Sequence, residues 1–415
     1  MNVLVLVESL RINETSSGIV SSTFLKALSH NKDINITCIY DKAFNYDITW
    51  LDASSFIKLN KTTFKEKSYV RKIPKLNGLI TAINGVNSIV KNEINNWVKA
   101  IDIQLKENDF DLIITLGSGS EFYPHYAMLN MRTSIKWLAN FHDPYPMSVY
   151  PEPYKKKRNI FLKWQEHYAN RIIKKADFVS FPSLYLKKLM QEKYHFENSK
   201  SIILPHIGIT LDNLPTSKKD NEVQLPENKF NLLHAGTLLG PRKVESLFNA
   251  FQTFLSSSKE KEELSILNVL GKVAKEHKNI NEIVTKFPNN FNIITKRVGY
   301  KKSLELIEKA SISLIIEADA EFSPFMPGKL ADLIYLEKPI LALTPKKSET
   351  IRILGSNHPY QARINDENEI LRVLNLLWND WRANKLNDLD YKSQKEYISA
   401  EKLNENINKI IKCTS

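Results

Sequence analysis

The sequence predicts an α/β fold of two Rossmann-like domains, each a doubly wound parallel sheet. Three observations predict it. Short apolar runs alternate with amphipathic helices, a polar and proline-punctuated segment at 214–228 interrupts this alternation, and the alternation then starts again. The 415 residues also fit two domains of roughly 200 residues each. We expect a first domain at 1–213, a linker at 214–228, a second domain at 229–390, and a C-terminal helix within 391–415 that packs back on the first domain.

The first half opens on a strand at 2–7 (NVLVLV), a continuous apolar run typical of a strand buried on both faces. A polar loop with Gly18 and a helix at 20–28 follow. Further elements expected here are strands at 35–40, 112–116, 136–141 and 178–181, and helices at 89–106 and 161–175. Strands that alternate with helices favour a parallel sheet.

The second half repeats this pattern. We expect strands at 230–234, 264–270, 291–295, 312–316 and 340–343, and helices at 244–255, 303–310 and 329–336. Ligands of such domains bind at the carboxyl ends of the strands, so the loops there should carry the chemistry. The two domains are expected to face each other across a cleft.

Composition indicates a globular protein, because 42% of the residues are hydrophobic and only 12 are glycine. The first apolar run ends at Glu8 without a basic segment before it, so we expect no signal peptide, and no apolar run is long enough to span a bilayer. Cys38 and Cys413 lack a second Cys or His at metal-ligand spacing. We therefore expect a cytoplasmic protein without a disulfide framework or a zinc site.

The net charge of +12 lies mainly in the first half, where residues 1–220 hold 30 Lys and Arg against 21 Asp and Glu. Basic clusters occur at 61–75 and at 155–188, which opens with KKKR. Such clusters favour an anionic membrane surface or a phosphate-bearing acceptor, and the alternative is a solvated basic face. Nucleic acid is not expected as a partner, because no helix-turn-helix, RRM or zinc-finger pattern accompanies the charge.

The segment HAGTLLGPRK, residues 234–243, lies between the first strand of the second domain and its helix. Gly236 lets the backbone approach a phosphate, and the following helix start offers free N–H groups. Arg242 and Lys243 add cationic donors. The segment therefore predicts a cradle for a diphosphate, and the alternative is a plain strand-to-helix turn with surface cations.

A second segment, EADAEFSPFMPGKLADLIYLEKPILAL at 317–343, follows a strand with an acidic, proline-rich loop. Gly328 opens a helix whose first turn carries Lys329 and Asp332. This helix start can bind an anion, and Asp332 can accept hydrogen bonds from a ribose diol. The alternatives are dipole compensation by Asp332 and a solvated charge at Lys329.

Two loops of the first domain follow strands in the same way. Gly117, Ser118 and Gly119 form a flexible loop with free N–H groups, which we expect at the acceptor side of the cleft together with Gly18. His142 lies just past a strand end in NFHDP, beside Asp143. A lone histidine is more often structural, but this position predicts that His142 lines the site.

These segments resemble glycosyltransferase family 4, and the resemblance runs in order along nearly the whole chain. HAGTLLGPRKVESLFNAF is similar to the family's glycine-then-basic loop, and PGKLADLIYLEKPILAL to its donor helix. The match implies that Arg242 binds the diphosphate and that Asp332 binds the ribose. Thr237 stands where many members carry arginine, so that phosphate contact is either lost or supplied by Lys243 or Lys329. The resemblance implies the two-domain GT-B architecture.

Many family members place a glutamate eight residues before the ribose carboxylate, a position held here by Pro324. Glu321 is the nearest substitute and our first choice for a contact to the transferred sugar, with Glu317 second and a solvated loop glutamate as the alternative. The segment NFHDP resembles the family's strand-end histidine near the anomeric centre of the donor, so His142 is expected to contact the sugar.

The resemblance implies a transferase that moves a sugar from a nucleoside diphosphate sugar to the hydroxyl of a glycan or lipid-linked acceptor, in polysaccharide or glycolipid assembly. It further implies retention of the anomeric configuration and no need of a metal or other cofactor. Two alternatives remain: a GT-B epimerase or phosphorylase, and a non-catalytic module that binds nucleotide sugars. A nicotinamide oxidoreductase is disfavoured, because GxGxxG is absent.

Overall fold

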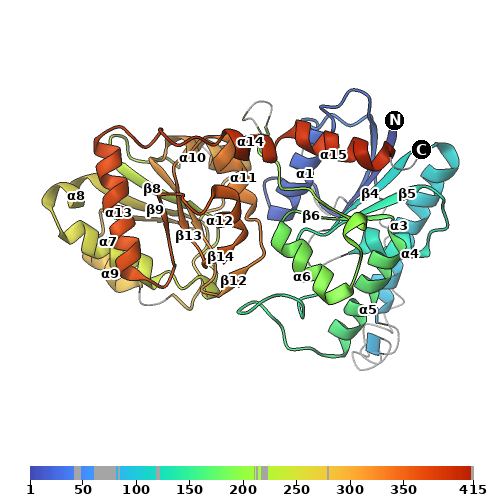
Figure 1. The fold of residues 1–415 in the computed structure, drawn as a ribbon, viewed down its shortest axis with the longest axis horizontal. Coiled ribbons are helices and arrows are strands. Elements are labelled where there is room, and N and C mark those ends of the chain that lie inside the picture. The colour runs from blue at the N-terminus through green and yellow to red at the C-terminus, as the bar shows by residue number, and fades with distance from the viewer. Residues whose placement is uncertain are drawn as a thin grey trace. The chain divides into compact units, whose positions relative to one another are not determined.

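The computed structural model describes residues 1–41, 48–59, 81–82, 85–117, 122–209, 211, 214–215, 223–277 and 280–412. It divides into two compact units, each with its own parallel sheet (Figure 1). Unit 1 comprises Met1–Tyr150, Tyr154–His206 and Ala400–Ser415, and unit 2 comprises Pro151–Pro153 and Ile207–Ser399. The basic cluster at 61–75, Cys413 and residues 216–222 of the expected linker lie outside the described residues.

Unit 1 is built from alternating strands and helices. In chain order these are β1 (Asn2–Val7), α1 (Ser16–Leu28), β2 (Asn35–Tyr40), β3 (Ser55–Lys58), α3 (Ser88–Glu107), β4 (Leu112–Leu116), α4 (Tyr123–Asn130), β5 (Lys136–Asn140), α5 (Ile160–Lys175), β6 (Phe178–Phe181), α6 (Leu184–Tyr194), β7 (Ser201–Ile203) and, at the chain end, α15 (Ala400–Lys412). A single 3₁₀ turn at Asn198–Lys200 precedes β7.

Among the described residues, the sheet of unit 1 has seven strands, all parallel, in the order β3-β2-β1-β4-β5-β6-β7. Residues 3–7 of β1 and all of β4 are buried, as their continuous apolar runs require of central strands covered on both faces. The strand order reverses direction between β1 and β4. A crevice at the carboxyl ends of these two strands is the place where such sheets bind ligands.

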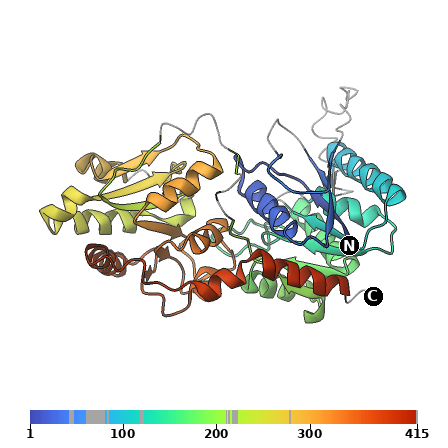
Figure 2. The same cartoon turned by 90° about the horizontal axis from the view of Figure 1, so that it is seen from above.

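The last helix, α15, packs on α1 of the same unit (Figure 1; Figure 2). Its buried face carries Leu403, Ile407 and Ile410 at helical spacing. Asn404 Nδ2 adds a hydrogen bond of 2.8 Å to the backbone oxygen of Ala27. Residues 400–412 are therefore part of unit 1, although most of that unit comes from the first half of the sequence.

Unit 2 repeats the alternation. Its elements are β8 (Phe230–Ala235), α7 (Glu245–Ser256), α8 (Lys259–Leu264), β9 (Ser265–Leu270), α9 (Ile280–Lys286), β10 (Phe291–Ile294), α10 (Tyr300–Lys309), β11 (Ile312–Ile316), β12 (Phe322–Ser323), α11 (Gly328–Tyr335), β13 (Ile340–Leu343), β14 (Lys347–Ser348), α12 (Glu349–Leu354), β15 (Gln361–Ala362), α13 (Glu367–Arg382) and α14 (Lys392–Tyr397). A 3₁₀ turn spans Gly240–Arg242, and β12 pairs with β14 outside the main sheet.

The main sheet of unit 2 has the parallel order β10-β9-β8-β11-β13-β15, so its switch point lies between β8 and β11. Helices α7 and α13 pack against each other beside this sheet. Aromatic contacts bind them to β8: the ring of Phe230 lies 6.2 Å from that of Phe254 and 5.6 Å from that of Trp378. The core thereby holds β8, the strand that leads to the candidate diphosphate cradle.

The sheet architecture agrees with the fold expected from the sequence, and most expected strands agree within one residue. One correction concerns Gly18. Helix α1 begins at Ser16 rather than near residue 20, because Thr15 caps it by accepting a hydrogen bond from the N–H of Gly18. Gly18 therefore lies in the first helical turn and its N–H is already used, so it does not form a loop site.

Candidate functional site

The candidate donor site lies at the switch point of the unit 2 sheet. Gly236 directly follows β8, and Glu317 directly follows β11, its neighbour in the sheet. Parallel strands place their carboxyl ends at one edge, so the loops after β8 and β11 meet there. Helix α11 begins at the far end of the loop that follows β11. The residues that the sequence singled out in unit 2 come from these three places.

The turn after β8 is shaped by a second glycine that sequence reasoning missed. Gly236 donates its N–H to the backbone oxygen of Leu270 at 2.9 Å. Gly271, which follows β9, has a φ of +150°, and a Cβ there would lie 2.3 Å from the backbone oxygen of Gly236. Gly271 therefore needs to be glycine for this close approach. The signal that could have found Gly271 is its place directly after a predicted strand, as for Gly236.

Arg242 lies at the end of the 3₁₀ turn that precedes α7, close to the start of that helix as expected. Its Nη1 donates to the backbone oxygen of Thr237 at 2.9 Å, which ties the arginine to the exposed end of the glycine turn. Its Nε is buried and has no hydrogen-bond partner among the described residues. Arg242 therefore keeps a donor available for a ligand.

Lys243 is less available than the sequence indicated. It takes a left-handed conformation with a φ of 34°, and its exposed Nζ forms an ion pair of 2.7 Å with Asp319. This partner raises the pKa of the lysine, first through the hydrogen bond and then through its charge. The cation is already paired on the loop after β11, so Arg242 is the stronger candidate for phosphate binding.

His234, the last-but-one residue of β8, is a site residue that sequence reasoning did not select. It is buried, and burial, then the nearby charge of Arg242, lowers its pKa to about 3, so the ring is neutral. Its Nδ1 lies 3.3 Å from the backbone oxygen of Leu314, which accepts the ring proton. Nε2 is then an acceptor without a partner in the described part of the chain. A Cβ on Gly236 would lie 3.2 Å from this atom.

The two candidate glutamates of the acidic loop differ sharply. Glu321 is exposed, whereas Glu317 is buried at the end of β11. Burial raises the pKa of Glu317 to about 7, against hydrogen bonds from Ser323 and Thr350 and the charge of Arg242. Its Oε2 accepts no hydrogen bond from any described residue. Glu317, our second choice from the sequence, thus lies beside Arg242 with a free acceptor atom.

Helix α11 carries the remaining residues that the sequence analysis expected at the donor site. Its first residue, Gly328, is half-buried, and one turn later Asp332 is buried, with Oδ1 accepting a hydrogen bond of 2.5 Å from the hydroxyl of Tyr300. Lys329 is half-buried, and its Nζ donates to Ser303 at 3.2 Å. Burial raises the pKa of Asp332 to about 6, although the charge of Lys329 opposes this rise. One oxygen of Asp332 therefore already accepts a hydrogen bond from Tyr300. A ribose hydroxyl would have to donate to the other oxygen.

In unit 1 the expected site residues lie on different elements of the same sheet edge. Gly117 follows β4, and a Cβ there would lie 3.1 Å from the ring of Phe122 and 3.4 Å from the backbone oxygen of Asn140. Ser118 and Gly119 lie outside the described residues. Gly117 therefore allows the chain after β4 to pass close to an aromatic side chain.

His142 and Asp143 are half-buried in the loop that follows β5. The ring of His142 lies edge-on to that of His206, with centroids 6.0 Å apart. Burial, and then the charge of His206, lowers the pKa of His142 to about 3, so this ring is neutral at pH 7. Burial raises the pKa of Asp143 to about 6. A neutral imidazole suits hydrogen bonding to a sugar better than it suits a charged contact to phosphate.

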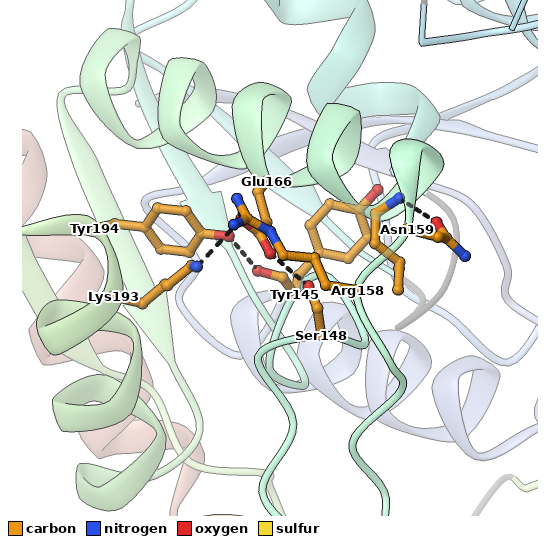
Figure 3. Close-up of polar contacts among 8 residues, drawn as sticks. Tyr145, Ser148, Arg158, Asn159, Glu166, Lys193 and Tyr194 are labelled. Carbon is orange, nitrogen blue, oxygen red and sulfur yellow. Dashed lines mark hydrogen bonds and ion pairs between the residues drawn. The ribbon is translucent and has the colours of Figure 1, made fainter. Parts of the chain in front are cut away.

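The loop that carries His142 is anchored by a polar network around Glu166 of α5 (Figure 3). The carboxylate of Glu166 accepts from Ser148 at 2.8 Å, from Arg158 at 2.6 Å and from Lys193 at 3.2 Å. In Figure 3 the two cations approach it from α6 and from the segment before α5. The network ties Ser148 in the middle of the loop and Arg158 near its end to α5, and Lys193 joins α6 to the same carboxylate. Sequence reasoning did not identify this network.

The described residues contain neither a candidate metal site nor a candidate membrane span. No three side chains of His, Cys, Asp or Glu are grouped there so that they could hold a metal ion. Among the same residues, no helix combines the length and the apolar character needed to cross a bilayer.

Comparison with known proteins gives matches in sequence family and in fold. Residues 88–207 match the family model Glycosyltransferase Family 4. The structure resembles a glycosyltransferase from Rickettsia africae ESF-5, with a TM-score of 0.62 at 14% identity over 99% of this chain and 97% of that one. It also resembles Anabaena Alr3699/HepE in complex with UDP and glucose, with a TM-score of 0.62 at 12% identity over 100% of both chains.

A third similar structure is an alpha,alpha-trehalose-phosphate synthase (UDP-forming) from Burkholderia xenovorans in complex with glucose-6-phosphate. Its TM-score is 0.62 at 9% identity, over 99% of this chain and 100% of that one. No curated protein matches the chain in sequence. The two parallel sheets and these full-length similarities confirm the expected fold. The chain therefore has the GT-B fold of glycosyltransferases, and in residues 88–207 it resembles glycosyltransferase family 4.

Proposed function

We propose that the protein transfers a sugar from a nucleoside diphosphate sugar to an acceptor hydroxyl, with the nucleotide held by unit 2. The observation that carries this proposal is the group of Arg242, Glu317 and Lys329 around the carboxyl ends of β8 and β11. In this group Arg242 keeps a buried donor and Glu317 a buried acceptor that no described residue satisfies. Such groups are costly unless a ligand pairs with them.

In this proposal the cations serve the leaving group. Negative charge develops on the diphosphate as the bond to the sugar breaks, and donors fixed in advance around it lower the barrier. Arg242 and Lys329 are placed for this role, and Asp332 offers its second oxygen to the ribose. We propose retention of configuration, with the leaving phosphate taking the acceptor proton, and no requirement for a metal ion. His142 then hydrogen-bonds the transferred sugar, and Glu317 takes the sugar contact that the sequence first suggested for Glu321.

We further propose that the acceptor is a glycan or a lipid-linked compound, used in polysaccharide or glycolipid assembly at the cytoplasmic face of a membrane. What supports this part is the charge, since residues 1–220 carry an excess of nine positive charges and residues 221–415 an excess of three. Anionic surfaces attract such an excess.

Thermal shifts with a panel of UDP, GDP, ADP and CMP compounds test the donor site directly. A ligand at 100 times its dissociation constant stabilises a protein by about 2.7 kcal/mol, so the correct nucleoside diphosphate should stand out. Turnover of the matching nucleotide sugar with an acceptor distinguishes the transferase from its alternatives. Isomerisation of the donor without acceptor would indicate an epimerase, and tight binding without any turnover would indicate a binding module.

Arg242→Ala should weaken the binding of the free nucleoside diphosphate at least tenfold. The reason is the loss of a charge-assisted hydrogen bond to phosphate, which contributes roughly 1.5–3 kcal/mol. Isothermal titration calorimetry on the full chain measures the effect. Arg382→Ala is the matched control, because Arg382 is an ion-paired arginine at the end of α13, 2.9 Å from Glu260. Equal nucleotide affinity in both variants would remove Arg242 from the diphosphate site.

A further inference from the structure

The start of α5 in unit 1 presents a surface that the donor chemistry does not use. Residues 155–163, KKKRNIFLK, hold five cations and no acid. Every residue of this segment except Leu162 is exposed. Six large apolar side chains are exposed among the described residues, and two of these, Ile160 at 46% and Phe161 at 43%, are neighbours in this segment. These two neighbouring apolar side chains, framed by cations, form a small mixed patch and distinguish the segment from a purely charged solvated face.

The structure holds this segment in a defined conformation. Asn159 caps α5 by accepting a hydrogen bond of 2.9 Å from the N–H of Leu162, whose side chain is buried. Arg158 is fixed to Glu166 at 2.6 Å (Figure 3). Glu166 is the one acid between residues 153 and 176, and it is paired with Arg158 and Lys193. Within residues 153–176 the charge beside Ile160 and Phe161 is therefore positive, and the one carboxylate is already paired.

The exposed side of α5 continues the same charge. Lys163, Arg171, Lys174 and Lys175 are exposed along the helix, together with His167. A second copy of this chain is a poor partner for such a surface, because two uniformly positive faces repel each other. Nucleic acid would pair its phosphates with the cations, but a phosphate backbone offers few apolar contacts to the exposed side chains of Ile160 and Phe161. An anionic lipid surface satisfies both kinds of side chain.

We infer that residues 155–163 form a membrane-docking surface, in which Ile160 and Phe161 enter the headgroup region of an anionic bilayer while Lys155, Lys156 and Lys157 contact lipid phosphates. Basic residues near a membrane attract its negative surface, and apolar side chains at the interface add burial that salt does not screen. The inference deepens the membrane attachment in the proposed function, because it names the surface and adds an apolar contribution to the electrostatic one.

Vesicle co-sedimentation of the full chain tests this surface. The wild-type chain should bind vesicles of phosphatidylcholine with phosphatidylglycerol, bind pure phosphatidylcholine at least tenfold more weakly, and lose affinity as salt rises. The double variant Ile160→Ser/Phe161→Ser should lower the affinity for anionic vesicles at least tenfold. The triple variant Lys155→Gln/Lys156→Gln/Lys157→Gln should lower it at least tenfold as well, and should reduce the salt dependence.

The matched control is Ile103→Ser on α3, because Ile103 is 51% exposed in a setting of mixed charge, with Asp102 paired to Lys106. This variant should bind anionic vesicles like the wild type. Circular dichroism and thermal unfolding show whether each variant is folded. Nucleoside diphosphate affinity should stay at the wild-type value in all of them, so a failed docking surface and a failed donor site give different results.

Three results would overturn the inference. The first is wild-type vesicle affinity in the Ile160→Ser/Phe161→Ser variant, since the attraction would then be electrostatic alone. The second is equal loss of affinity in Ile103→Ser, since the effect would not belong to this surface. The third is binding of a single-stranded oligonucleotide as tightly as anionic vesicles, with the same loss in the double variant, since the surface would then serve nucleic acid.

Discussion

His142→Ala should lower turnover with the true donor and acceptor about 100- to 1000-fold, while the affinity for the free nucleoside diphosphate stays within twofold of wild type. The proposed contact of His142 is to the reacting sugar, and a hydrogen-bond donor or acceptor that acts in the transition state contributes on this scale. The neutral ring, whose pKa burial lowers to about 3, should keep this role unchanged from pH 6 to pH 8. Steady-state kinetics and calorimetry of the nucleotide give the two numbers.

Asp332→Ala provides the contrasting result. Because Asp332 is proposed to bind the ribose, its loss should weaken donor and nucleoside diphosphate alike, so that KM and the nucleotide dissociation constant rise together. Tyr300→Phe removes the 2.5 Å hydrogen bond that this carboxylate receives. It shows how much of the loss in Asp332→Ala comes from local packing rather than from ligand binding. Wild-type turnover in His142→Ala would show that the histidine is structural.

Glu317→Gln should become more stable relative to wild type as the pH rises from 5 to 8, by about 2 to 3 kcal/mol. Burial raises the pKa of Glu317 from an ordinary 4.5 to about 7 in the folded protein. Between these values the folded state holds a proton that the unfolded state releases, so wild-type stability falls as the pH rises and levels off above pH 7. Glutamine cannot ionise, so the stability of the variant does not fall with pH in this way. Chemical unfolding of the ligand-free chain at pH 5 and pH 8 measures the difference.

The control for this pH effect is Glu321→Gln, in which the carboxylate is exposed on the loop that follows Glu317. The difference between this variant and wild type should be the same at pH 5 and pH 8. A parallel change in both variants would mean that the titration belongs to another group. An unchanged difference in Glu317→Gln alone would mean that Glu317 is not held neutral by burial.

The fold was predictable from the sequence because its central strands are continuous apolar runs. The runs at 2–7, 112–116 and 312–316 coincide with β1, β4 and β11, and each is buried on both faces. The shorter edge strands were missed, since β7 and β15 have three and two residues and no distinctive pattern. Helix starts set by side-chain caps were also missed, as Thr15 shows for α1. Hydrophobic periodicity indicates which residues are buried. The start of a helix depends instead on a single hydrogen bond to a capping side chain, which periodicity does not reveal.

The site was predictable only where a residue's position along the chain determines its role. Arg242 and Asp332 were selected from their positions after a strand and near a helix start, and their binding of the donor stays a prediction. The choice between Glu321 and Glu317 depended on burial, which a loop sequence does not reveal. Lys243 looked free because its partner Asp319 lies 76 residues away. His234 resembled a core residue of β8, and its unpartnered nitrogen emerges only in three dimensions.

The position of α15 on α1 has a consequence for the order of folding during synthesis. Residues 207–399 must all be made before the ribosome produces α15, which at 5–20 residues per second takes roughly 10 to 40 s. During that time the surface of α1 that later contacts Leu403, Ile407 and Ile410 stays exposed to solvent. Unit 1, which is made before unit 2, is thus completed only after unit 2 has been synthesised.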